Sequence, residues 1–116
     1  MNIEILREYC LSKKAVSESF PFDETTLVFK VMDKMFVLTS LEGDLRMNLK
    51  CDPIRAVELR EQYYSIIPGF HMNKKHWNTV IIDGELDKED LFELIDHSYD
   101  LVVKSLPKYK QKELFG

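Results

Sequence analysis

The chain has 116 residues, of which 45% are hydrophobic and 31% are charged, and its formal net charge at pH 7 is −4. This composition fits a single soluble globular domain spanning residues 1–116 and excludes wholesale disorder. No apolar run approaches the roughly 18 residues that a membrane span needs. The acidic balance also argues against a protein that coats nucleic acid without specificity, because such binding depends on releasing many counterions.

The N-terminal segment predicts a helix. Asn2 is a suitable cap, and Ile3, Leu6 and Cys10 fall on one face at helical spacing. Because acids occur in the first turns and no long apolar core follows, the segment does not resemble a signal peptide. Cys10 and Cys51 show no spacing signature, so we expect free thiols and a cytoplasmic protein.

Several strands are predicted before residue 51. Residues 15–22 predict a short strand and then a loop, because Pro21 forbids a long helix. Residues 26–40 predict a hairpin connected through Met32-Asp33-Lys34, although this connection lacks the glycine we would expect. Residues 45–50 alternate in polarity. The predicted inner side is Leu45, Met47 and Leu49, and the outer side is Arg46, Asn48 and Lys50.

Helix signals dominate the rest of the chain. Asp52-Pro53 predicts a helix that runs to about residue 64, with Ile54 and Val57 turned inward. Pro68-Gly69 breaks the chain, and short strands are predicted at residues 70–72 and 77–82. Asp87 caps a last helix, and a basic tail begins at about residue 107. The last helix has an apolar stripe formed by Leu91, Leu94, Ile95 and Val102.

The order of these elements predicts an α+β fold, in which an antiparallel sheet has helices packed on one face. Sequential hairpins account for the sheet, and the helices lie mainly at the two ends of the chain. The sequence contains no internal repeat or low-complexity segment.

The segment from Pro68 to Thr79 is the richest in functional groups. It contains two of the three histidines, the single tryptophan, a Lys-Lys pair and no acid. Such groups hold phosphates and stack on bases, which makes them candidate nucleic-acid contacts. These candidates are Asn73, Lys74, Lys75, His76 and Trp77. The alternative is a solvated loop that its tryptophan anchors, because strand alternation could place Trp77 inward with Ile81.

Arg46, Asn48 and Lys50 form a second candidate set. On a strand they project from one face over about 13 Å, which suits a track of phosphates, and Lys30 could extend it. The alternative is the ordinary solvent face of a half-covered sheet. Residues 83–100 contain eight acids and one base, and the helix macrodipole already explains acids at the start of a helix.

The hypotheses of metal binding and of enzyme activity have weaker support. His71 and His76 are five residues apart, which fits neither strand nor helix ligation, and no zinc spacing occurs. The sequence has no phosphate loop, nucleophile elbow or paired-carboxylate signature. Cys51, next to Asp52 at a helix N-cap, could have a lowered pKa, but a half-buried structural cysteine is the simpler interpretation. We therefore expect no enzyme activity, cofactor or metal.

The chain also resembles a known family, the MmcQ/YjbR-like proteins. The resemblance rests on Phe20-Pro21-Phe22, on residues 26–31, on residues 48–53 and above all on residues 68–80, and it continues through residues 94–99. It implies a frataxin-like (CyaY-like) fold and a DNA-binding role, in some accounts through a pair of wing-like elements. It implies no catalytic motif.

The resulting hypothesis is a monomeric domain that binds DNA through both candidate sets and has no membrane role. Lysines would position the phosphate backbone, and Asn73 and His76 would add base or sugar contacts. One alternative is a chaperone-like protein-interaction module. Another is a frataxin-like metal binder that uses the acidic helix.

Overall fold

The computed structural model describes all residues 1–116 and contains four helices and six strands. In chain order they are α1 (Ile3–Leu11), β1 (Val16–Ser19), β2 (Thr26–Val31), β3 (Lys34–Ser40), β4 (Arg46–Lys50), α2 (Pro53–Gln62), β5 (Ile66–Pro68), β6 (Trp77–Ile81), α3 (Lys88–Ser105) and α4 (Lys108–Phe115). None of these helices is both long enough and apolar enough to cross a bilayer.

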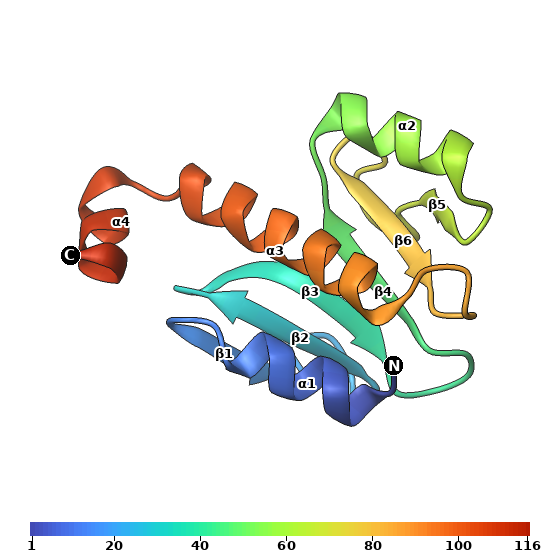
Figure 1. Ribbon diagram of the computed structural model, residues 1–116. Coiled ribbons are helices and arrows are strands. Elements are labelled where there is room, and N and C mark those ends of the chain that lie inside the picture. The colour runs from blue at the N-terminus through green and yellow to red at the C-terminus, as the bar shows by residue number, and fades with distance from the viewer.

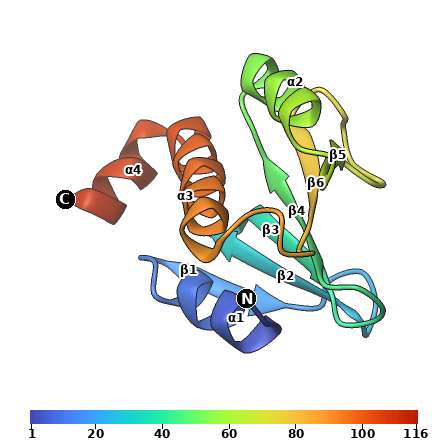
Figure 2. The same cartoon turned by 45° about the vertical axis from the view of Figure 1, so that its right-hand side comes forward.

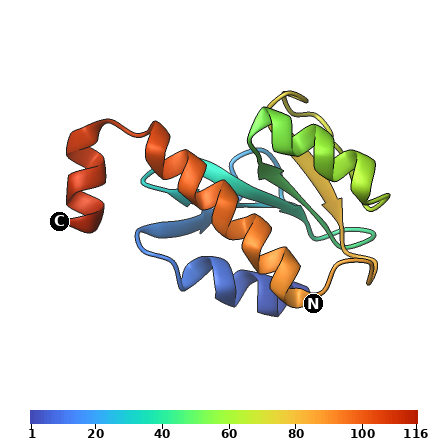
Figure 3. The same cartoon turned by 45° about the horizontal axis from the view of Figure 1, so that its top comes forward.

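The strands form one antiparallel sheet in the order β1-β2-β3-β4-β6-β5, which confirms the predicted α+β class (Figure 1). Helices α1, α2 and α3 lie on one face of this sheet, and no helix covers the other face (Figure 2). Helix α3 crosses the middle of the sheet, with α1 to one side and α2 to the other (Figure 3). We call the uncovered side the open face.

The hydrophobic core lies between the sheet and the helices. Phe29, Val37 and Leu49 are aligned across β2, β3 and β4, and all three are buried in the same cluster as Leu6 of α1 and Ile95 of α3. On β2 and β4 the alternation works as predicted: every second residue faces the helices and the others face away.

The sheet opens out where β3 and β4 part, and α3 fills the gap. These strands pair only over residues 37–39 and 47–49. Beyond that point Ser98 Oγ donates to the Phe36 carbonyl at 2.6 Å and accepts from the Lys50 N–H at 2.9 Å. One buried hydroxyl thus satisfies two backbone groups that the sheet leaves unpaired.

The hairpin between β2 and β3 turns without glycine. Met32 and Asp33 have φ values of 46° and 69°, so both adopt the left-handed conformation that a two-residue hairpin turn requires. The predicted hairpin is confirmed, and its connection is one residue shorter than expected. A bulge between Phe29 and Lys30 places both Phe36 and Val37 in the core.

The predicted strand at residues 70–72 is wrong. The strand is β5 at Ile66–Pro68, and residues 70–72 form turns. His71 has a φ of 59°, which is incompatible with an extended strand and folds the segment back on itself.

The predicted inner face of α2 is also wrong. Ile54 is 73% exposed and Val57 is 49% exposed, whereas Ala56 is fully buried. Ala56 allows close approach to β6, where its carbonyl accepts a hydrogen bond from the Asn78 side chain. Because α2 covers only the edge of the sheet, its buried stripe is narrow.

The predicted basic tail is helical. The segment after Pro107 forms α4, and Leu114 is only 2% exposed within the common core cluster. Its lysines lie on the helix surface, while this one leucine ties the segment to the domain.

Candidate nucleic-acid interface

The open face carries cations and no strand carboxylate. Lys30, Arg46 and Lys50 project from it, at register positions opposite to those of the core residues. The only acidic residue in any strand is Glu18, which points to the covered face and pairs with Arg7 of α1 at 2.6 Å. All charged strand residues on the open face are therefore basic, although the net charge of the protein is −4.

These cations are largely free of partners. Lys30 and Lys50 form no ion pair, and the Arg46 guanidinium reaches the Asp44 carboxylate only at the 4.0 Å limit. By contrast, Arg55 of α2 binds Glu93 of α3 at 2.6 Å. The open-face cations thus remain available to an anionic ligand, as the predicted phosphate track requires.

Asn48 has a different role from its two neighbours on β4. Its amide nitrogen donates to the Phe70 carbonyl at 3.2 Å, and its amide oxygen accepts from the Thr79 hydroxyl. The Thr79 oxygen in turn accepts from the Phe70 N–H at 2.9 Å. Asn48 therefore positions the 70–72 loop over the open face, and its amide is mostly engaged.

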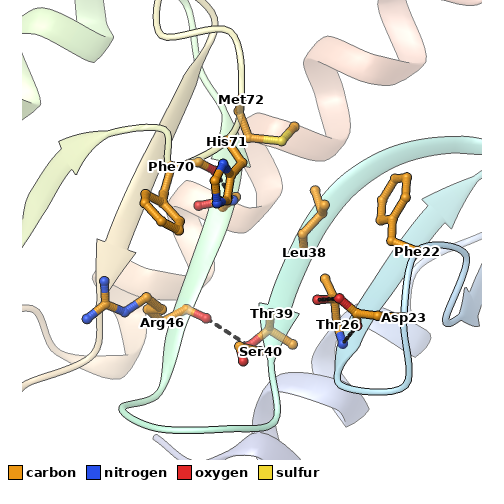
Figure 4. A pocket seen from close by; sticks show the side chains of 11 residues that line it. Phe22, Asp23, Thr26, Leu38, Thr39, Ser40, Arg46, Phe70, His71 and Met72 are labelled. Carbon is orange, nitrogen blue, oxygen red and sulfur yellow. Dashed lines mark hydrogen bonds between the residues drawn. The ribbon is translucent and has the colours of Figure 1, made fainter.

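Two loops border a pocket of about 440 Å³ on the open face (Figure 4). Phe22 and Asp23 stand on one side, and Phe70 and His71 stand on the other (Figure 4). The complete lining is Phe22, Asp23, Thr26, Leu38, Thr39, Ser40, Arg46, Asn48, Phe70, His71 and Met72. Four of these eleven residues are apolar, namely Phe22, Leu38, Phe70 and Met72, and the others are polar or charged.

Both aromatic walls are unusually exposed for their size: Phe22 is 63% exposed and Phe70 is 61% exposed. The His71 imidazole lies against the Phe70 ring, with 4.0 Å between ring centroids. Leu38, between the two loops, is 6% exposed. Sequence reasoning missed this pocket; the signal that could have indicated it is the pair of phenylalanines in Phe20-Pro21-Phe22, in a segment that was predicted to end in a loop.

The Asp23 carboxylate is a fixed anion at the pocket rim. Its Oδ1 accepts the backbone N–H groups of Thr25 and Thr26 at 2.9 and 2.6 Å. These hydrogen bonds hold the pKa of Asp23 below its usual range, so the group is ionised at neutral pH.

The 73–76 loop is a tightly held turn. The Asn73 carbonyl accepts the N–H groups of His76 and Trp77 at 3.3 and 3.0 Å, which closes a single turn of the backbone. The Asn73 side chain accepts the Lys75 N–H at 2.9 Å. Arg60 of α2, which sequence reasoning missed, donates to the Lys74 carbonyl and thereby connects the turn to the helix.

The structure divides the predicted site residues between two places. Arg46 and Asn48 line the pocket, whereas Lys74 and Lys75 line a hollow of about 430 Å³ beside α2. The Lys74 ammonium donates to the Gly69 carbonyl at 3.1 Å. His76 is half-buried, and its carbonyl accepts the Cys51 N–H beyond the end of β4 at 2.8 Å.

Trp77 shares a face with Thr79 and Ile81 as predicted, but this face is the open one. Its register partner is Lys50, and its ring is only partly buried. The inward burial considered from the sequence is wrong, because Asn78 and Val80 take the positions that face the helices. Gly69 makes room for Trp77, because a Cβ on Gly69 would lie only 2.8 Å from the Trp77 Cβ.

Other reactive groups do not assemble into a centre. No three His, Cys, Asp or Glu side chains come together in a way that could hold a metal ion. Burial raises the pKa of the Cys51 thiol to about 11, so it is protonated at neutral pH despite its position at a helix N-terminus.

The comparisons with known proteins agree on one family. The model of the YjbR family matches residues 11–101. YjbR of Escherichia coli strain K12 is 36% identical over 115 residues, which cover 98% of each chain. YbdF of Escherichia coli O157:H7 is 39% identical over 112 residues, covering 96% of this chain and 92% of YbdF.

Solved structures extend this similarity to the fold. The crystal structure of Deinococcus radiodurans protein DR2400 superposes with a TM-score of 0.92 at 47% identity, covering 97% of this chain and 87% of that one. A crystal structure from Pseudomonas syringae gives a TM-score of 0.75 at 28% identity, covering 87% of this chain and 98% of that one. None of these names states an activity. The chain belongs to the YjbR family.

Proposed function

We propose that this protein binds DNA along the open face of its sheet. The observation that carries the proposal is the set of open-face cations Lys30, Arg46 and Lys50: none has a close ion pair, and their sheet face has no strand carboxylate although the protein is acidic. Fixed cations without internal partners are suited to binding a polyanion, since phosphate contacts supply most of the affinity for nucleic acid.

The positions of these cations also indicate that the bound strand runs along β4. Arg46 and Lys50 lie at the two ends of β4, about 13 Å apart at strand spacing, which spans roughly two phosphates of an extended chain. A ligand reaches Lys75 only by extending past the end of β4 toward α2. We assign Lys74 to structure, because its ammonium already donates to the Gly69 carbonyl.

The acidic helix explains why one face is preferred. Glu89, Asp90, Glu93, Asp96 and Asp100 all belong to α3, on the opposite side of the sheet. Glu93 and Asp96 are paired with Arg55 and Lys13, and the other three acids repel a polyanion from the covered face, so approach from the open side is favoured.

The test is a comparison of two triple variants with the same change in net charge. One replaces Lys30, Arg46 and Lys50 with alanine, and the control replaces the exposed lysines Lys104, Lys108 and Lys112 at the C-terminal end. Affinity for a labelled 20-nucleotide DNA is measured by anisotropy at several salt concentrations. The open-face variant should flatten the slope of log affinity against log salt by about 2–3, whereas the control should change it little.

Two results would overturn the proposal. One is a wild-type protein that binds no DNA at low salt. The other is an equal loss in both triple variants, because that would reflect net charge and not a particular face.

A further inference from the structure

We infer that the pocket between Phe22 and Phe70 receives one unpaired nucleobase of the bound DNA, with the adjoining phosphate on Arg46. This inference rests on the proposed DNA-binding function and adds to it the chemical form of the ligand. It implies that the protein binds single strands, or strands with an extruded base, in preference to regular duplex.

The walls of the pocket suit a flat ring. Phe22 and Phe70 come from loops on opposite sides of the pocket, and both rings are more than 60% exposed (Figure 4). Leu38 contributes an apolar floor. Exposed aromatic rings around a hollow mark a binding site, and a base gains affinity by stacking on such rings. The volume of about 440 Å³ lies in the range of small-molecule sites.

The two ends of the pocket carry opposite charge, which orients the nucleotide. Arg46 lies on the Phe70 side, and Asp23 lies on the Phe22 side (Figure 4). The Asp23 Oδ2 accepts only one hydrogen bond, from the Thr26 hydroxyl at 3.1 Å, so it can accept another from a base N–H. A phosphate is attracted to Arg46 and repelled by Asp23.

The Phe70 wall is preformed. Asn48 and Thr79 hold both backbone polar groups of Phe70, and the positive φ of His71 turns the chain back at this point. A ligand therefore does not have to order this loop on binding, which favours affinity.

A paired and stacked base cannot occupy this site. In a duplex, neighbouring bases cover both faces of each base, so contact with the aromatic walls requires extrusion. Extrusion is unfavourable in a regular duplex and easy in a single strand. The pocket therefore predicts a preference for single strands, which the open-face cations alone do not.

The experiment compares a 12-nucleotide single strand of random sequence with a fully abasic 12-mer, which has the same phosphates and no bases. The variants are Phe22→Ala and Phe70→Ala, with Tyr109→Ala on α4 as the control because its ring is 64% exposed. Wild type should bind the intact strand about 5- to 150-fold more tightly than the abasic strand, the range that one lost base stack produces.

The two wall variants should lose that difference, keep their affinity for the abasic strand and keep the wild-type melting temperature. Tyr109→Ala should behave as wild type. Equal wild-type affinity for intact and abasic strands would overturn the pocket assignment and would leave the proposed role of the open-face cations standing. If neither strand binds, the pocket assignment and the proposed function fail together.

A second arm separates a base within a strand from a free nucleotide. Deoxynucleoside monophosphates are added as competitors of the labelled 12-mer. Competition only at concentrations at least 100-fold above those of the unlabelled strand supports the assignment. Competition at equal concentration would overturn it and mark free nucleotides as the ligand.

Discussion

The two faces of the sheet use their polar groups in opposite ways. On the covered face, Ser98, His97 and Asn78 each satisfy a backbone or side-chain partner, and Glu18 is neutralised by Arg7. On the open face, Lys30 and Lys50 have no ion pair. The difference shows where this small domain obtains its stability and where it keeps groups free for a ligand. Substitutions on the covered face should therefore reduce stability, and those on the open face should reduce binding.

The largest expected effect is on the covered face. Ile95→Ala removes a fully buried side chain from the core and should lower the free energy of unfolding by about 2–5 kcal/mol. The matched change Ile81→Ala on the open face removes a partly buried side chain and should cost about 1 kcal/mol. Urea denaturation measures both losses, and equal values would contradict the division between the two faces.

A loss of similar size is expected where the sheet opens out. Ser98→Ala leaves the Phe36 carbonyl and the Lys50 N–H without their partner, at about 1–3 kcal/mol for each buried group. Ser105→Ala is the control, since that hydroxyl donates only to the Val102 carbonyl in its own helix. A Ser98 variant as stable as the control would show that these backbone groups find water instead.

The smallest effect is a dependence of stability on pH. The neutral His97 ring accepts the Asp52 N–H at 3.2 Å, and burial, followed by Arg55, lowers the pKa of His97, while Glu93, Asp52 and Asp100 act in the opposite direction. The folded state therefore binds fewer protons than the unfolded state, whose histidine titrates near 6.5. This contribution is complete above that pH and is lost as the pH falls through the folded pKa.

The melting temperature should accordingly fall between pH 7.5 and pH 5 more in wild type than in His97→Gln, whose amide oxygen also accepts a hydrogen bond but does not titrate. Other groups titrate in both proteins, so the comparison isolates His97. Parallel profiles would contradict a structural role for the neutral ring.

Local signals in the sequence were enough to predict much of the sheet and the caps of three helices. The alternation from Arg46 to Lys50 and the caps at Asp52 and Asp87 are properties of a few adjacent residues, and the structure confirms them. The face of α2 was predicted wrongly, because the two exposed apolar residues at its start suggested a stripe. Its actual contact, made by Ala56, depends on how close the edge of the sheet lies.

The site required information that no local pattern contains. Phe22 and Phe70 are 48 positions apart in sequence and meet across one pocket only because β2, β3 and β4 are adjacent. Similarly, Lys75 and Arg46 share a charge but line different hollows, since the turn that Arg60 holds faces α2. The composition of the sequence identifies the residue types that could form a site. Which of them lie together depends on the order of the strands in the sheet.

The most direct test of the central claim is to map the bound face by nuclear magnetic resonance. Isotope-labelled protein is titrated with a 12-nucleotide single-stranded DNA, and the change in each backbone amide signal is followed. The account predicts the largest changes in the 22–26 and 70–72 loops and at Leu38, Arg46 and Lys50, with α3 unchanged. Changes concentrated on α3, or spread evenly over both faces, would contradict it.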